Sequence, residues 1–245
     1  MSRYFWFFNL WWEIWLILCC TNKVLGYPKN LHLLSQYIGS LFLKDHIHHF
    51  LYNQLQPDLE IFGIDIDINL CPDISLTLHI QIYYSASTVY HAPSDLLGIG
   101  GMHHEYIRAA PNWQKKGMPW YNCVFVEHDP ENEGFRSLGI VQGQMFFTFR
   151  HDDILYSCAL VHWFETYGDH PCLETGMWRV KPDFDQQQQR VCSVIYIDSI
   201  LRAAHLLVFG KNFIPEKLQF YQSLCAFQLY YVNKYADHHS HEVAF

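Results

Sequence analysis

The residues from 144 to 164 constrain the fold of this chain more than any other stretch. Two apolar, aromatic-rich segments flank the polar tetrad Arg150, His151, Asp152 and Asp153, which is the pattern of a β-hairpin with a four-residue loop. Phe, Tyr, Trp, Val and Leu fill both arms, and such side chains pack well on a pleated, half-buried surface. We therefore predict strands here and a sheet that is built around this hairpin.

Strand-like segments separated by turn signals continue on both sides of the hairpin. We expect them at residues 79–85, 88–91, 121–127, 176–181 and 191–197. They are enough for a small antiparallel β-barrel or curled sheet of about five to seven strands. Two other segments are predicted to be helical: residues 102–109, closed by Pro111, and residues 199–205, for which Asp198 resembles an N-cap.

Helical periodicity is clearest near the two ends of the chain. Apolar residues recur at three- and four-residue steps from 31 to 55, which predicts one or two amphipathic helices, and a similar stripe runs through residues 216–245. The predicted fold class is therefore α+β, a barrel or curled sheet with flanking N-terminal and C-terminal helices. The predicted organisation is an apolar segment over residues 1–30, a helical lead-in over 31–60 and an α+β domain over 61–245.

Residues 4–20 are almost wholly apolar and are interrupted only by Asn9 and Glu13. A signal peptide is one interpretation, because Arg3 precedes the apolar run and small residues suited to cleavage follow it. A membrane span or anchor is the second, although these 17 residues carry a carboxylate and fall short of the roughly 20 that a span needs. A soluble extension is the third. The first two interpretations predict a secretory or membrane location.

The composition disfavours two classes of protein. The net charge is −8, with 16 Lys and Arg against 24 Asp and Glu, which argues against a broad basic surface that grips nucleic acid. The eight Cys include no C-x-x-C pair, which argues against a cysteine-based zinc or redox motif and favours buried thiols in a reducing compartment. No cofactor is predicted.

Three groups of residues offer weak metal-binding or catalytic patterns. Asp65 and Asp67 alternate with apolar residues and would share one face of a strand. A His cluster lies in the first helical region, and a second cluster of His and carboxylate lies near the C-terminus. These clusters consist of His46, His48 and His49, and of His238, His239, His241 and Glu242. No group is complete enough to predict a site. Two carboxylates at this spacing occur by chance in many strands, a polar helix face explains the first His cluster, and a solvated or partner-docking terminus explains the second.

Several longer motifs stand in a fixed order through most of the chain. They are Tyr-Ser-Ala-Ser at 84–87, Ala-Pro-Ser-Asp at 92–95, Gly-Ile-Gly-Gly-Met at 98–102, Glu105 with Ile107 and Arg108, Tyr-Asn-Cys-Val-Phe-Val at 121–126, Cys-Ala-Leu-Val-His-Trp-Phe at 158–164, Glu-Thr-Gly-Met-Trp at 174–178, Ile-Leu-Arg-Ala-Ala-His-Leu at 200–206 and Val-Asn-Lys-Tyr-Ala-Asp-His-His at 232–239. Through them, residues 50–245 resemble a family of uncharacterised proteins of mushroom-forming fungi. Members of that family lie at the C-terminal end of large transposable-element reading frames of the Plavaka and KDZ-associated type.

The resemblance implies an accessory domain beside a transposase, in a nuclear protein. The acidic triad of an RNase H-like core and the cysteine-rich fingers of such elements are absent from this sequence. The leading hypothesis is thus a non-catalytic interaction module that contacts chromatin, DNA or a transposase core. The alternatives are a metal-dependent hydrolase or nuclease remnant and a protein anchored to the membrane through residues 4–20.

Aromatic side chains near the hairpin supply the candidate binding surface. Trp163, Phe164, Tyr167 and Trp178 lie in or beside predicted strands. Exposed aromatic faces accept cations, bases or partner side chains, whereas buried ones pack the core. The partner predicted for such a surface is a protein or a nucleic acid.

Overall fold

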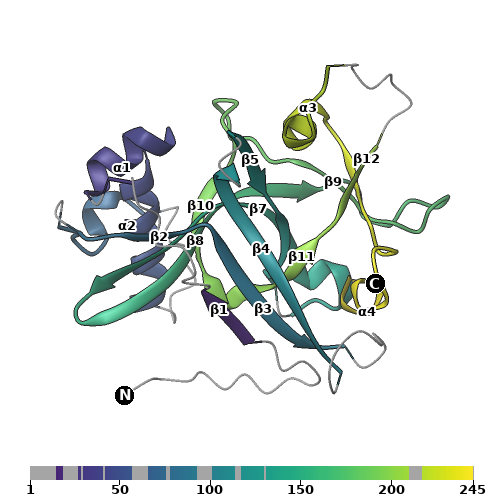
Figure 1. Cartoon of the computed structure of the whole chain (residues 1–245), viewed down its shortest axis with the longest axis horizontal. Helices are drawn as coiled ribbons and strands as arrows, with labels where there is room; N and C mark the ends of the chain where they lie inside the picture. The colour runs from purple at the N-terminus through teal and green to yellow at the C-terminus, as the bar shows by residue number, and fades with distance from the viewer. Residues whose placement is uncertain are drawn as a thin grey trace.

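The computed structural model of the chain describes residues 15–18, 27–28, 30–40, 42–56, 66–75, 78–92, 101–113, 117–129, 131–209 and 217–244. Figure 1 shows a curved sheet, with α1 and α2 at one side and α3 and α4 at the other. The helices are α1 (Leu31–Ile38), α2 (Leu43–Leu55), α3 (Ser223–Ala226) and α4 (His238–Ala244). The strands are β1 (Trp15–Leu18), β2 (Gln81–Tyr83), β3 (Ser85–His91), β4 (Met102–Trp113), β5 (Met118–Tyr121), β6 (Cys123–Glu127), β7 (Leu138–His151), β8 (Ile154–Thr166), β9 (Arg179–Pro182), β10 (Cys192–Tyr196), β11 (Ile200–Ala204), β12 (Leu206–Val208) and β13 (Tyr230–Val232).

The predicted hairpin is formed by β7 and β8, but its loop is shorter than expected. Arg150 pairs with Leu155 and His151 pairs with Ile154, which leaves a two-residue turn. Asp152 and Asp153 make this turn with φ values of 48° and 62°. A two-residue turn with positive φ at both positions matches the twist of the flanking strands, and Asp tolerates this conformation better than most residues.

The main sheet curls nearly into a barrel. Seven strands follow one path in the order β11, β6, β7, β8, β9, β13, β12, while β10 adds to β8 and β2 adds to β7. The two ends of this path, β11 and β12, are separated in the chain by His205 alone. The edges of the sheet must therefore come close together. The predicted α+β fold, with a small antiparallel barrel-like sheet and flanking helices, is confirmed.

A smaller antiparallel sheet in the order β1, β3, β4, β5 packs against one face of the hairpin. Ala86 of β3 and Ile107 of β4 share a buried cluster with Val141 and Phe146 of β7 and Val161 of β8. The apolar N-terminal segment contributes β1 to this sheet, paired from Trp15 to Leu18 with β3. The rest of residues 4–20 lies outside the described part of the chain. No helix in that described part is long and apolar enough to cross a membrane.

The other face of the hairpin is covered by two different layers along its length. Toward the turn, Leu34, Ile47 and Leu51 of α1 and α2 pack on Phe147 and on neighbouring strand residues. Toward the far end, β7 and β8 pack inside the curled sheet against β9 and β13 in a second cluster. That cluster includes Phe125, Ile140, Phe164, Trp178, Val180 and Tyr230. A gap between these two clusters is where the candidate site lies.

The helices at the N-terminal end begin and end at local signals. The Asn30 side chain accepts hydrogen bonds from the backbone N–H groups of His32 and Leu33 at 2.9 and 3.4 Å, so it caps α1. Gly39 ends α1 with φ of 70°, which a glycine adopts without strain. The helical lead-in predicted from the apolar periodicity therefore forms as α1 and α2.

Two helix predictions were wrong. Residues 102–109 lie in strand β4, and Pro111 is inside that strand near an irregularity in its pairing with β5. Residues 200–204 form β11, which pairs with β6, so Asp198 caps no helix of residues 199–205. In the tail, α3 and α4 are helical as predicted, but Tyr230–Val232 forms β13. Pairing with distant strands determines whether these segments are helical or extended, because local periodicity alone does not distinguish helix from strand in short apolar runs.

Candidate functional site

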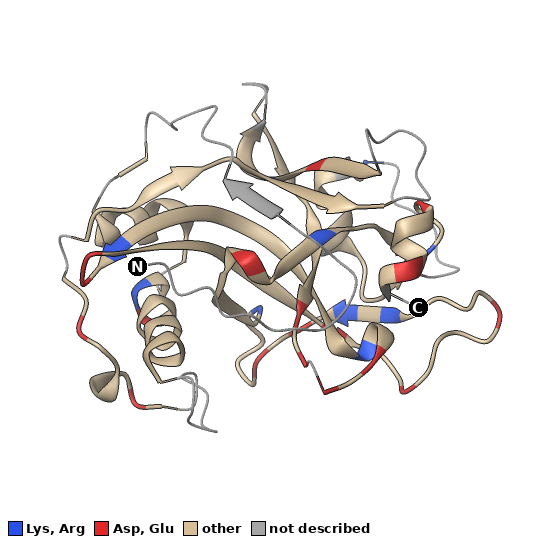
Figure 2. Cartoon of the chain, turned by 90° about the horizontal axis from the view of Figure 1, so that it is seen from below, with Lys and Arg blue, Asp and Glu red and all other residues tan. Residues whose placement is uncertain are grey.

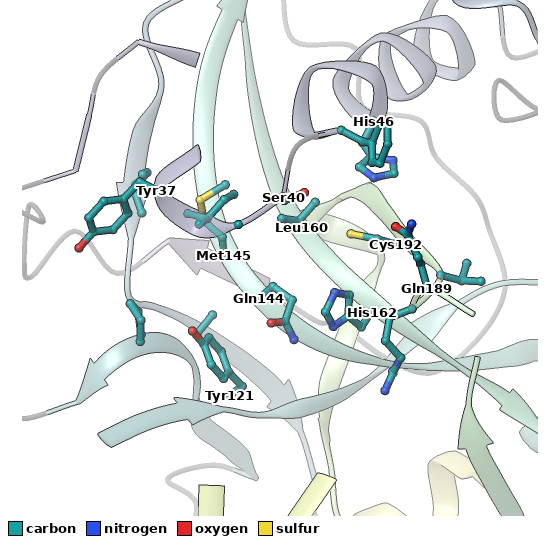
Figure 3. A pocket seen from close by; sticks show the side chains of 18 of the residues that line it. Tyr37, Ser40, His46, Tyr121, Gln144, Met145, Leu160, His162, Gln189 and Cys192 are labelled. Atoms are coloured by element: carbon teal, nitrogen blue, oxygen red, sulfur yellow. The ribbon is translucent and has the colours of Figure 1, made fainter. Parts of the chain in front are cut away.

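A cavity of about 670 Å3 opens between the N-terminal helices and the curled sheet. Figure 3 shows it with Met145 and Leu160 on the strands, Tyr121 at one end and His46 approaching from α2. Its volume lies in the range of about 300 to 1,000 Å3 that is usual for ligand pockets. Apolar and aromatic side chains form most of its wall, and a few polar side chains join them.

The position of the cavity follows from the alternation of side chains along β8. Cys158 and Leu160 belong to the cluster under the helices, and Phe164 belongs to the cluster inside the curled sheet. Residues at steps of two share one face of a strand. His162 therefore lies on the same face between the two clusters, and it lines the cavity.

A β-bulge directs the amide of Gln144 into the cavity. The pairing of β7 with β8 shifts between Gly143 and Met145, so Gln144 has no partner on β8. Gln144 and Met145 both line the cavity, although consecutive residues of a regular strand point to opposite faces. Bulges re-aim side chains in this way and are frequent beside functional sites.

Burial favours the uncharged forms of the two histidines and the cysteine that line the cavity. Burial, together with the nearby charge of Arg190 and the proximity of His46, lowers the pKa of His162 to about 4. Burial and the neighbouring His49 lower the pKa of His46, against the opposing effect of Asp45. Burial also raises the pKa of the Cys192 thiol to about 12. At neutral pH the cavity therefore presents neutral imidazoles and a protonated thiol.

Three polar side chains that line the cavity, those of Gln144, His46 and His162, can form further hydrogen bonds. Within the described residues, the side chains of Gln144, His46 and His162 form no hydrogen bond with another protein group. Figure 3 shows Gln144 and His162 among the side chains that line the cavity. A neutral imidazole has one donor and one acceptor, and a carboxamide has both. These groups can therefore hydrogen-bond to whatever fills the cavity.

The rim of the cavity carries one charge of each sign. The Arg190 guanidinium lies 4.9 Å from the ring centroid of Phe164 and 5.6 Å from that of Phe184, and it donates a hydrogen bond of 2.8 Å to the carbonyl of Trp163. Asp185 accepts hydrogen bonds of 2.8 Å from the backbone N–H groups of Gln187 and Gln189. Both charged side chains therefore already form hydrogen bonds with backbone groups near the rim.

The four aromatic residues predicted as a binding surface do not share one surface. Phe164 and Trp178 are 5% and 8% exposed and belong to the core inside the curled sheet. Trp163 points to the opposite face of β8, is half-buried, and donates a 2.7 Å hydrogen bond from Nε1 to the Ser193 hydroxyl. Tyr167 is exposed, and its ring lies under the Arg179 guanidinium. Of the four, only Tyr167 and part of Trp163 are accessible.

The C-terminal cluster of predicted metal candidates is divided between the two sides of α4. His238 forms an ion pair of 3.0 Å with Glu242 on the exposed side, whereas His239 is buried and stacks on Tyr90 at 4.4 Å. His241 is exposed. Among the described residues, no group of three or more His, Cys, Asp or Glu is placed to hold a metal ion.

The remaining candidates are also separated. Asp67 accepts hydrogen bonds from the backbone N–H and the side chain of Asn69 in a short turn, while Asp65 lies outside the described residues. His48 is buried and its Nδ1 lies 2.6 Å from the carbonyl oxygen of Pro72. His46 faces the cavity instead, so His46 and His48 do not point to one site. His49 is half-buried on the same helix and does not line the cavity.

A buried ion-pair network near α4 has no counterpart in the sequence prediction. Arg202, 3% exposed, donates hydrogen bonds of 2.8 and 2.6 Å to the two carboxylate oxygens of Asp237, and its Nη1 lies 2.9 Å from His239 Nδ1. Glu105 accepts a hydrogen bond of 2.9 Å from the backbone of Ala203 and lies 4.0 Å from Arg202. All of these residues fall within the ordered motifs quoted above, and the network fastens the C-terminal segment to the sheet.

The sequence analysis did not predict the cavity, because the residues that line it come from many separate segments of the chain. The only local signal is a polar residue within an apolar strand, such as Gln144 in β7 or His162 in β8. Such a residue on a buried face must either find a partner or face a cavity.

Comparisons of the chain with models of protein families, with curated proteins and with solved structures found no match.

Proposed function

We propose that this chain is a non-catalytic interaction module, the accessory part of a transposon-derived nuclear protein that contacts chromatin, DNA or a transposase core. The cavity between the N-terminal helices and the curled sheet is the proposed contact site. The observation that carries the proposal is a cavity lined by His46, His162 and Cys192, whose burial favours their uncharged forms, and by Gln144.

A reactive site needs groups that exchange protons near the working pH. General bases work best when their pKa is close to that pH, and a cysteine nucleophile reacts as the thiolate. A pKa of about 4 makes His162 a weak base at neutral pH, and a pKa of about 12 keeps Cys192 in the thiol form, so neither side chain is well suited to its role. Neutral imidazole, thiol and amide groups can still hydrogen-bond and make van der Waals contacts, which supports binding without reaction.

The charge distribution supports recognition of a partner by shape and hydrogen bonds. Figure 2 shows the Lys and Arg of the described residues scattered over several elements, with Asp and Glu concentrated in turns and loops. Phosphate neutralisation by a continuous basic surface dominates non-specific DNA binding. A DNA partner would therefore be recognised at local groups, and its affinity should depend only weakly on salt.

Variants at the rim of the cavity test the proposed contact site. Gln189→Trp places a large side chain at the rim, whereas Gln186→Trp makes the same change in the same turn at an exposed residue that does not line the cavity. Binding of the full chain to duplex DNA, to histone-tail peptides and to a transposase core is measured by fluorescence anisotropy at micromolar concentrations. We expect one of these partners to bind, and Gln189→Trp to weaken that binding at least tenfold while Gln186→Trp does not.

Two results would count against the proposal. If the chain binds none of the three partners at micromolar concentration, it is not the interaction module that we propose. Equal affinities of both variants and the unmodified chain would place the contact elsewhere on the molecule.

A further inference from the structure

The residues that line the cavity indicate which chemical class of ligand it can bind. We propose that it binds a nucleobase, as a free nucleoside or as an unpaired base of a nucleic-acid strand. This inference rests on the proposed function in that it assigns a ligand class to the same cavity.

The wall of the cavity combines two surfaces that a planar heterocycle needs. Met145 and Leu160 are buried and provide an apolar floor, and the ring of Tyr121 lies at one end. Gln144 and His162 line the cavity from the adjacent strands β7 and β8. Proteins recognise an extruded base by contact with its faces and by hydrogen bonds to its donor and acceptor edge.

The hydrogen-bond donors and acceptors of Gln144 and His162 match those on the edge of a nucleobase. A carboxamide forms two parallel hydrogen bonds with a base that presents an adjacent donor and acceptor, as Gln does with adenine. The Gln144 amide has this capacity, and the bulge turns it toward the cavity. His162 adds one further donor or acceptor beside it.

Ligands of other chemical classes fit these groups less well. An acyl chain would leave the Gln144 amide and the His162 imidazole without hydrogen-bond partners, which is unfavourable. Among the described residues that line the cavity, an anionic ligand would find one cation, Arg190, which already donates a hydrogen bond to the Trp163 carbonyl. A cationic ligand would find one carboxylate among them, Asp185, which already accepts two backbone hydrogen bonds. The ligand class that remains is uncharged and has both donors and acceptors.

Calorimetric titration of the full chain with adenosine, guanosine, cytidine and thymidine at pH 7 tests this assignment. We expect at least one nucleoside to bind with a Kd on the order of 10 to 100 µM, as is usual for a ligand of this size. Gln144→Leu and His162→Phe, which keep similar volumes, should each weaken binding about tenfold. Gln36→Leu, on the exposed side of α1, is the matched control and should leave the affinity unchanged.

Short single-stranded oligonucleotides distinguish the two sources of the base. If the natural ligand is an unpaired base, an oligonucleotide that carries the preferred base binds more tightly than the nucleoside, and an abasic version loses that gain. If it is a free nucleoside, the oligonucleotide binds no better than the nucleoside. Either outcome supports a nucleobase ligand, provided that Gln144→Leu weakens the binding.

The assignment is overturned if none of the four nucleosides binds at 1 mM, or if Gln144→Leu and His162→Phe both retain the full affinity. The two variants are independent, so failure of one to fold leaves the other as the test. If nucleosides do not bind while Gln189→Trp still abolishes macromolecular binding, the ligand class is wrong and the contact site is retained.

Discussion

Gly139 of β7 lies directly under the indole ring of Trp163. A Cβ atom at this position would be 2.7 Å from Cζ3 of Trp163 and 3.1 Å from Cγ2 of Val126. Because real Cβ atoms do not approach other atoms so closely, a methyl group here would push the indole out of its site. The ring also holds β10 through the hydrogen bond from Nε1 to Ser193. Trp163 is therefore an internal support of the sheet.

We predict that Gly139→Ala lowers the free energy of unfolding by about 1 to 3 kcal/mol, the usual cost of overpacking. Gly143→Ala on the same strand is the control, because its Cβ would meet neighbouring atoms at ordinary contact distances of 3.6 Å or more. Urea unfolding followed by far-UV circular dichroism measures both. If Gly143→Ala lowers the free energy of unfolding as much as Gly139→Ala does, the contact with the Trp163 indole is not the cause of the destabilisation.

At the scale of elements, the link between α4 and β11 depends on one buried cation. Burial alone would raise the pKa of Asp237, but hydrogen bonds from Arg202 and from the backbone N–H of Ser240 outweigh this effect and lower the pKa to about 2. Burial raises the pKa of Glu105, the second carboxylate near Arg202, against its hydrogen bond from Ala203. Asp237 is thus the carboxylate that neutralises Arg202.

We predict that Asp237→Asn lowers the free energy of unfolding at pH 7 by about 2 kcal/mol, as expected for a hydrogen bond between charged groups. The folded-state pKa of Asp237 is depressed, so its contribution is present above about pH 4 and is lost as the pH falls toward 2. Denaturant unfolding at several pH values measures this. The difference in unfolding free energy between Asp237→Asn and the unmodified chain should begin to shrink below about pH 4 and disappear only as the pH falls to about 2. A constant difference would contradict the assignment.

The sequence allowed prediction of the elements whose contacts are local. The β7–β8 hairpin and the helices α1 and α2 have strong periodic patterns, and the structure contains all of them. Strand β4 was predicted as a helix that ends at Pro111, because its state depends on pairing with β3, many residues away. The bulge at Gln144 leaves no mark on the local pattern. The cavity could not be predicted for the same reason, since it forms only when α2, β7, β8 and β10 come together.

For the molecule as a whole, buried histidines link stability to pH. The pKa values of His46, His162 and His239 are all lowered, mainly by burial. Between about pH 6.5 and pH 4 the unfolded chain binds protons at these positions that the folded chain does not bind. Stability therefore decreases as the pH falls through this range.

We predict that the Tm decreases by roughly several degrees between pH 7 and pH 5, since about 1 kcal/mol shifts the Tm of a chain of this size by roughly 2 to 4 °C. The pKa of His49 is lowered by burial as well, and His162→Phe removes one of these groups, so this variant should show a smaller decrease over the same interval. Scanning calorimetry at constant ionic strength measures the effect. A Tm that rises on acidification would mean that the imidazoles are charged in the folded chain.

The uncharged state of the cavity is measured most directly by NMR titration of the His162 imidazole in the full-length chain, with His162→Phe to assign its resonances. The predicted result is an apparent pKa of about 4, so that the ring is neutral at pH 7. An apparent pKa of about 6 or above, close to that of an exposed histidine, would contradict the uncharged binding cavity on which the proposed function rests.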